Sequence, residues 1–168
     1  MNKIKNILAL TDLSEFSQEG VRYALQLAGT LGAEVTVYHV VNCYELGSGC
    51  CEDGEIARID VASPQYERLK RKYQLDLARF LNQHFSDLIP WMKIREKIEI
   101  GVPEKNIVEW AKRESVDLVV ISTHATSDLC RGFVGSLAEK IVVGVPCPVL
   151  CIHAEAEGQA RQEVAAAG

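Results

Sequence analysis

A short apolar run near residue 120 is the feature that most constrains this fold. Residues 117–122 read Asp-Leu-Val-Val-Ile-Ser, without polar alternation. Such a run is typical of a strand buried on both faces, as in a parallel sheet. A polar loop follows, and Gly135-Ser136 then opens a helix that ends before Gly144. Because first-turn N–H groups lack intrahelical partners, the stretch predicts an anion site that holds, or once held, the phosphates of a nucleotide.

Strands and helices alternate along the whole chain. Apolar and β-branched runs predict strands at residues 4–10, 33–41, 91–100, 117–122 and 146–153. Helical spacing of apolar residues predicts helices from Ser14 to about Leu31, from Ser63-Pro64 to about Phe85, from Pro103 onward and from Gly135-Ser136. The alternation predicts an α/β fold with an open, doubly wound five-stranded parallel sheet, which is Rossmann-like.

The polarity of each run predicts its place in the sheet. Residues 91–100 alternate between apolar and charged side chains, so this strand is expected at an edge. Residues 4–10 and 117–122 are apolar on both sides and are expected at the centre. Numbered along the chain, the strands then lie in the order 3-2-1-4-5, and the connections reverse between the first and the fourth. Ligands bind beside such a switch point, where Asp12 and residues 122–125 are expected to meet.

Length and charge bound the classes of partner. The chain of 168 residues predicts a single domain over residues 1–153, with a long loop insertion at 42–63 and a disordered tail at 154–168. A net charge of −5 gives no basic excess for nucleic acid or an anionic membrane surface. No run reaches transmembrane length, and residues 1–13 are interpreted as a strand rather than a signal peptide, so a cytoplasmic protein is expected.

The six cysteines fall into two groups with different predicted roles. Cys130, Cys147 and Cys151 are predicted to pack in the core, the last two on one face of a strand. The group of Cys43, Cys50 and Cys51 falls in the predicted loop, where a redox or metal role stays open. The sequence contains no Cys-x-x-Cys pair.

Four segments carry a resemblance to a known family. They are Ile-Leu-Ala-Leu-Thr-Asp-Leu-Ser at 7–14, His-Val-Val at 39–41, Gly-Val-Pro at 101–103, and residues 117–125 through Gly135-Ser136 to Pro-Cys-Pro-Val-Leu at 146–150. In these segments the chain resembles the universal stress protein family, over nearly its whole length except residues 42–63 and the tail. The resemblance implies a stress-response regulator that binds ATP or AMP, with Mg²⁺ accompanying ATP, and no more enzymatic activity than slow ATP hydrolysis.

The resemblance also implies a set of nucleotide-binding residues, which comprises Thr11, Asp12, Val40, Ser122, Thr123, His124, Ala125, Arg131, Gly135, Ser136 and Leu137. ATP-binding members of the family carry glycine at the positions of Ser122 and Ala125. An alternative therefore stays open, in which the chain is a homodimeric interaction protein with a degenerate nucleotide motif. No nucleophile with a neighbouring base is evident, so no catalytic residue is predicted.

Several of these residues also have purely structural interpretations. Asp12 could cap the helix that starts at Ser14, and residues 136–139 read Ser-Leu-Ala-Glu, which is a capping box. His39 lies within a strand and is expected to be structural.

The strand at 147–153 is expected to mediate assembly. It is predicted at a sheet edge and carries Val149, Leu150 and Ile152. Related proteins form homodimers through this strand, and the resemblance implies the same here. A regulatory protein partner is also expected.

Overall fold

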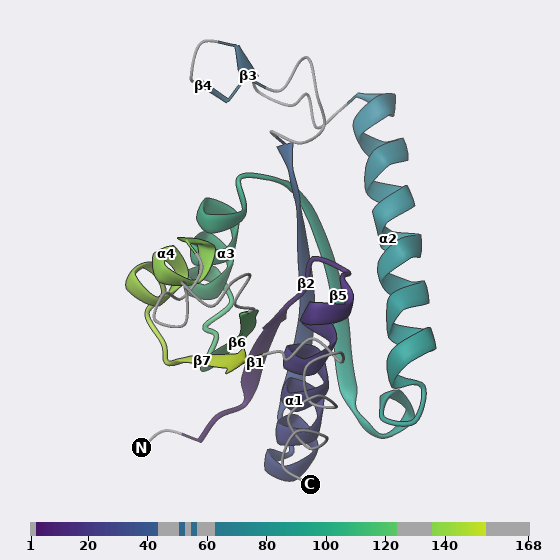
Figure 1. Cartoon of the computed structure of the whole chain (residues 1–168), viewed down its shortest axis with the longest axis vertical. Helices are drawn as coiled ribbons and strands as arrows, with labels where there is room; N and C mark the ends of the chain where they lie inside the picture. Colours follow the sequence, from purple (N-terminus) through teal and green to yellow (C-terminus); the bar gives the residue numbers. More distant parts are fainter. Residues whose placement is uncertain (1–2, 44–50, 53–54, 57–62, 124–135, 154–168) are drawn as a thin grey trace, which may run out of the picture.

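The computed structural model describes residues 3–43, 51–52, 55–56, 63–123 and 136–153 (Figure 1). The strands are β1 (Asn6–Leu10), β2 (Glu34–Asn42), β3 (Cys51–Glu52), β4 (Glu55–Ile56), β5 (Lys93–Gly101), β6 (Leu118–Thr123) and β7 (Val149–His153). The helices are α1 (Glu15–Leu31), α2 (Pro64–Phe85), the short 3₁₀ helix η2 (Ile89–Trp91), α3 (Pro103–Arg113) and α4 (Ser136–Gly144).

Five strands form one parallel sheet in the order β5-β2-β1-β6-β7. This confirms the predicted order, with the switch point between β1 and β6. The central strands are buried as their apolar runs predict, because Ile7 to Leu10 and Leu118 to Ile121 are at most 7% exposed. At the edge, β5 alternates between more and less exposed side chains, and Ile98 and Ile100 face the core.

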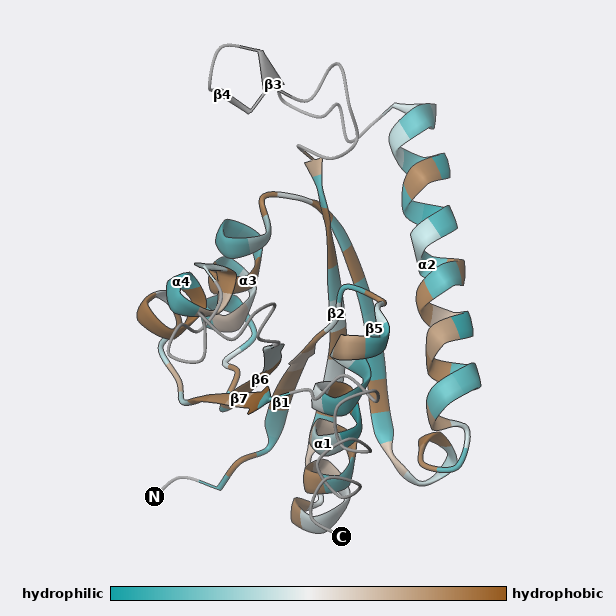
Figure 2. Ribbon diagram, viewed as in Figure 1, coloured by the Kyte–Doolittle hydropathy of each residue, from teal (hydrophilic) through white to brown (hydrophobic). Residues whose placement is uncertain are grey.

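Helices cover both faces of the sheet, as Figure 1 shows with α2 on one side and α3 and α4 on the other. The first face packs against Val21, Ala24, Leu25 and Ala28 of α1 and Leu77, Phe80, Leu81 and Phe85 of α2. The second packs against Ile107, Trp110 and Ala111 of α3 and Ala138 and Ile141 of α4. In Figure 2 the hydrophobic colour runs along β1 and β7, whereas α2 is hydrophilic over much of its surface. The core is therefore two apolar layers that share one sheet.

Three local predictions need correction. The strand predicted at 146–153 begins at Val149, because Pro146 and Pro148 lack the N–H groups that a strand ladder uses, so Cys147 precedes β7. The strand predicted from residue 91 begins at Lys93, because Pro90 lies in a 3₁₀ turn in which the Trp91 N–H donates to the Leu88 carbonyl. The predicted loop at 42–63 contains a short antiparallel pair, β3 with β4, in which Cys51 lies opposite Ile56. Runs of two residues are too short to show an alternating pattern in the sequence.

The cysteines divide differently from the prediction. Cys147 is half-buried against the α3–α4 side of the core, as predicted, but Cys151 is exposed, so its predicted core packing is wrong. The reason is its place on β7, the last strand of the described sheet. Cys43 is buried at the end of β2, and Cys130 lies outside the described residues. Within the described ranges, no cluster of three His, Cys, Asp or Glu side chains is placed to hold a metal ion.

Candidate functional site

A cavity of about 630 Å³ lies where β1, β2 and β6 end. This is the switch point at which the topology predicts a ligand. Seven of the predicted residues line it, namely Thr11, Asp12, Val40, Ser122, Thr123, Ser136 and Leu137. The other four, His124, Ala125, Arg131 and Gly135, lie outside the described residues.

The turn from β1 into α1 forms the floor of the cavity. The Thr11 hydroxyl accepts a hydrogen bond from the Leu13 N–H at 2.9 Å and lies 2.7 Å from the Ser17 hydroxyl. Ser17 also donates to the Ser14 carbonyl at 2.9 Å. Leu13 has a φ of 66°, a left-handed conformation that is uncommon for a leucine. Hydrogen bonds on both sides of Leu13 thus hold a strained turn in one geometry.

Ser14, at which the helix is predicted to start, is the N-cap residue of α1, but its side chain makes no capping hydrogen bond. Its hydroxyl donates to Asp12 Oδ1 at 2.5 Å, and its N–H donates to the same oxygen at 2.9 Å. Donation to this carboxylate directs the Ser14 hydroxyl toward Asp12, and its oxygen accepts no hydrogen bond from the first turn of α1. Asp12 therefore stabilises the turn before the helix through Ser14, rather than capping the first-turn N–H groups of α1 as its structural interpretation expected.

Asp12 is nevertheless exposed to the cavity, which it lines. Burial raises the pKa of its carboxyl, but the hydrogen bonds from the Ser14 hydroxyl and N–H outweigh that effect, so the pKa lies below its usual value. Asp12 is therefore an anion at neutral pH and can only accept hydrogen bonds. Such a group suits the hydroxyls of a sugar and repels phosphate.

The end of β2 forms a second wall. His39 Nδ1 lies 2.8 Å from the Thr11 carbonyl oxygen and must donate to it, because a carbonyl only accepts. The ring lies against Tyr73 of α2, with 5.6 Å between the ring centroids. His39 is buried, as its structural interpretation implies, and it also lines the cavity together with Val40 and Asn42.

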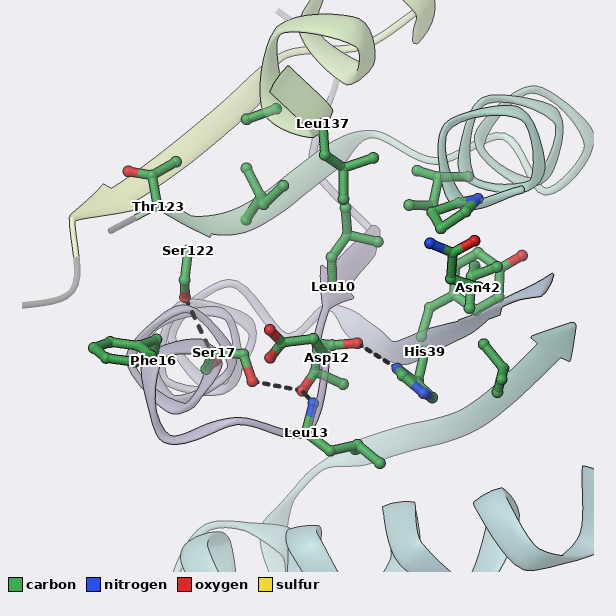
Figure 3. Close-up of a pocket in the computed structure, with 18 of the residues that line it drawn as sticks. Leu10, Asp12, Leu13, Phe16, Ser17, His39, Asn42, Ser122, Thr123 and Leu137 are labelled. Carbon is green, nitrogen blue, oxygen red and sulfur yellow. Dashed lines mark hydrogen bonds between the residues drawn. The ribbon is translucent and has the colours of Figure 1, made fainter. Parts of the chain in front are cut away.

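An apolar wall faces these polar groups. Leu10, Tyr38, Ile107 and Leu137 contribute to it, and Figure 3 shows Leu137 and Leu10 on one side of the cavity with Asp12 below them. An apolar wall beside a few fixed polar groups is the usual composition of a site for a flat organic ligand.

A half-buried hydrogen-bond network lies behind this wall. The Tyr38 hydroxyl donates to Glu99 Oε2 at 2.6 Å, and the Asn106 amide donates to the same oxygen at 2.9 Å. Lys97 Nζ lies 3.2 Å from the other oxygen of Glu99. Burial raises the pKa of Glu99, but these hydrogen bonds outweigh it and lower the pKa. The network joins β2 and β5 to the first turns of α3.

The remaining polar groups come from β6 and α4. Ser122 lies in the extended backbone of β6, so its non-glycine side chain causes no left-handed strain there. Ser136 and Leu137 belong to the first turn of α4. That turn gives the cavity a helix N-terminus, where N–H groups suit an anion.

Several residues that line the cavity are not marked by any sequence motif. Phe16 and Ser17 lie in the first turns of α1, Asn42 ends β2, and Tyr73 reaches the cavity from α2. The rule that ligands bind at strand ends could have identified Asn42. If the rule also includes the first turn of the helix that follows a strand, it could have identified Phe16 and Ser17. No local pattern marks Tyr73, because its approach depends on how α2 packs.

Sequence comparison relates the chain to known proteins. The sequence model of the universal stress protein family matches residues 3–153. A universal stress protein of Methanocaldococcus jannaschii is 31% identical over 152 residues, which cover 90% of this chain and 83% of that protein.

Solved structures show the same fold. The universal stress protein UspA from Lactobacillus plantarum superimposes with a TM-score of 0.67 at 24% identity, covering 90% of this chain and 99% of the other. A universal stress protein in complex with cAMP and one from Archaeoglobus fulgidus in complex with dAMP each give a TM-score of 0.53 at 18% identity. Each match covers 90% of this chain; it covers 98% of the chain in the cAMP complex and 99% of the chain in the dAMP complex. The chain therefore belongs to the universal stress protein family.

Proposed function

We propose that this chain is a stress-response regulator that binds an adenine nucleotide, AMP or ATP, in the cavity at the switch point. The observation that carries the proposal is the convergence of an ionised Asp12, an apolar wall and the N-terminus of α4 around one cavity of about 630 Å³. The complexes of structural neighbours with cAMP and dAMP support an adenine nucleotide as the class of ligand.

Each part of the cavity suits one part of the ligand. The adenine base would lie against Leu10, Ile107 and Leu137, with its edge toward the backbone of Val40. The ribose hydroxyls would donate to Asp12. The phosphates would lie toward Ser136 and the end of β6, where a helix N-terminus offers N–H donors. Mg²⁺ would accompany ATP and bind chiefly to its phosphates.

Isothermal titration calorimetry tests the proposal directly. AMP and ATP, the latter with and without Mg²⁺, are titrated into the protein, with GMP as the comparison for base selectivity. We expect saturable binding of AMP or ATP and weaker binding of GMP. The absence of binding heat at millimolar AMP and ATP would refute the proposal.

A second proposal concerns assembly. We propose that two copies of the chain form a homodimer by pairing their β7 strands. The support is that β7 lies at the edge of the described sheet and carries Val149, Leu150 and Ile152, with an exposed Cys151 between the last two. Backbone groups on an apolar edge strand are ready to pair with another chain.

Light scattering after size exclusion tests the homodimer. Cys151→Glu should give a monomer, since it sets two like charges together at the pairing strand. Leu75→Glu, at an exposed position of α2, is the control and should retain the dimer. A monomeric native chain would contradict the proposal.

The homodimer would also be the functional form if the nucleotide motif has decayed. In that case the native chain binds no nucleotide, and glycine at positions 122 and 125 creates binding. A cytoplasmic location and a regulatory protein partner complete the proposal and stay predictions.

A further inference from the structure

Gly20 lies in the interior of α1, where glycine is unfavourable because it adds no side-chain contact and orders a very flexible backbone. The residue is buried and faces the end of β6. A buried helical glycine calls for a packing reason, and here the neighbouring residue is Ser122 of the candidate site.

The two residues fit each other closely. The Gly20 N–H donates to Ser122 Oγ at 2.9 Å, and the same oxygen lies 3.5 Å from the Ser17 carbonyl oxygen. A Cβ atom at position 20 would collide with Ser122 Oγ and would lie 3.1 Å from Ser122 N. The Ser122 hydroxyl therefore occupies the space that the missing side chain of Gly20 leaves free. Figure 3 shows this hydroxyl pointing toward α1, on the side away from Leu137.

The direction of this hydroxyl matters for a ligand. Ser122 lines the cavity at the end of β6, toward which the phosphates are proposed to lie. A serine side chain has three staggered orientations, and the one observed directs its oxygen against α1. In this orientation the hydroxyl lies on the α1 side of β6, and Cβ is the remaining side-chain atom of Ser122 at the end of the strand.

We infer that Gly20 is a positioning residue for the nucleotide site, an inference that depends on the proposed function. Gly20 holds the Ser122 hydroxyl against α1 and so keeps the end of β6 open to phosphate. A methyl group at position 20 closes that space. The hydroxyl then turns toward the cavity, or the end of β6 moves away from α1, and both changes disturb the surface that phosphate approaches.

A double-mutant cycle tests the inference, with AMP affinity measured by calorimetry. Gly20→Ala should weaken AMP binding about tenfold or more when residue 122 is serine, and by no more than about threefold in the Ser122→Gly background. Gly29→Ala is the matched control. Gly29 lies in the same helix, and its added Cβ would meet only the flexible end of Met92, at 3.1 Å. The Gly29→Ala substitution should leave AMP affinity unchanged.

A second pair of variants covers a failure of Gly20→Ala to fold, judged by circular dichroism and thermal unfolding. Ser122→Thr adds a methyl group that cannot share the space beside Gly20, whereas Ser122→Ala adds nothing beyond Cβ. The threonine variant should bind AMP about tenfold more weakly than the alanine variant.

Three results overturn the inference alone. Gly20→Ala could reduce AMP affinity equally in the native and Ser122→Gly backgrounds, or it could reduce AMP affinity in neither. The third result is equal AMP affinity of the threonine and alanine variants. No binding of AMP by the native chain overturns the proposed function, and this inference with it.

Discussion

Tyr38→Phe removes one hydroxyl from the network behind the apolar wall of the cavity. Tyr38 is 1% exposed, and its hydroxyl donates at 2.6 Å to Glu99, whose side chain is 23% exposed. A hydrogen bond to a charged group contributes about 1.5–3 kcal/mol. Glu99 keeps Asn106 and Lys97 as partners in the variant, so we expect a loss near the lower end, about 1–2 kcal/mol. For a domain of this size that lowers the melting temperature by about 2–8 °C.

The pH dependence makes this prediction more specific. The folded-state pKa of Glu99 lies below its ordinary value of 4.5, so the ionised group stabilises the fold. That contribution is complete above the unfolded pKa and is lost as pH falls through the folded pKa. The stability difference between native protein and Tyr38→Phe should therefore be largest near pH 7 and should shrink below about pH 4.

Urea unfolding over a series of pH values from 7 downward measures both effects. Tyr23→Phe is the matched control, because Tyr23 is 46% exposed on α1, and it should change stability by less than about 0.5 kcal/mol. A Tyr38→Phe effect no larger than the control, or one that does not shrink as the pH is lowered stepwise from 7, would refute the reasoning.

Three further predictions follow from single residues. Asp12→Ala should weaken AMP binding about tenfold or more, since an ionised acceptor is lost, and Asp12→Asn should lose less; equal calorimetric affinity of both variants and the native chain would contradict the assigned role. Ser115 has a φ of 50°, so Ser115→Gly should raise the unfolding free energy by about 0.5–1 kcal/mol, while Ser115→Ala should not raise it. Urea unfolding that finds the alanine variant more stable than the glycine variant would contradict this. Ile141→Ala, at a fully buried position of α4, should cost about 2–5 kcal/mol in the same assay, against less than about 0.5 kcal/mol for Val143→Ala at an 87% exposed position of the same helix; similar losses would mean that α4 packs differently.

The sheet order could be predicted because polarity reports burial. The unbroken apolar run at 118–121 indicates a strand with a helix layer on each side, and the alternation in β5 indicates an edge. Parallel strands bring their C-terminal ends to one side, so the strand order alone places Asp12, Val40 and Ser122 together. These inferences depend on periodicity, which short-range sequence carries well.

Other features depend on choices that periodicity does not record. Ser14 has the residue type of a helix cap, but its hydroxyl bonds Asp12 because a carboxylate is within reach. The alternation of side chains along β7 predicts which face of the sheet Cys151 occupies. It does not predict how much of that face the helices cover. Gly20 and Ser122 are separated by 102 positions, and their fit arises only when α1 and β6 are packed.

Amide chemical shifts measured while AMP is added test the central proposal most directly. Binding in the switch-point cavity should shift the signals of Thr11 to Leu13, Val40 to Asn42, Ser122 and Leu137, and should leave α2 near Leu75 and the groove between α3 and α4 around Lys112 unchanged. No shifts at millimolar AMP, or shifts confined to the α3–α4 groove, would contradict a nucleotide site at the ends of β1, β2 and β6.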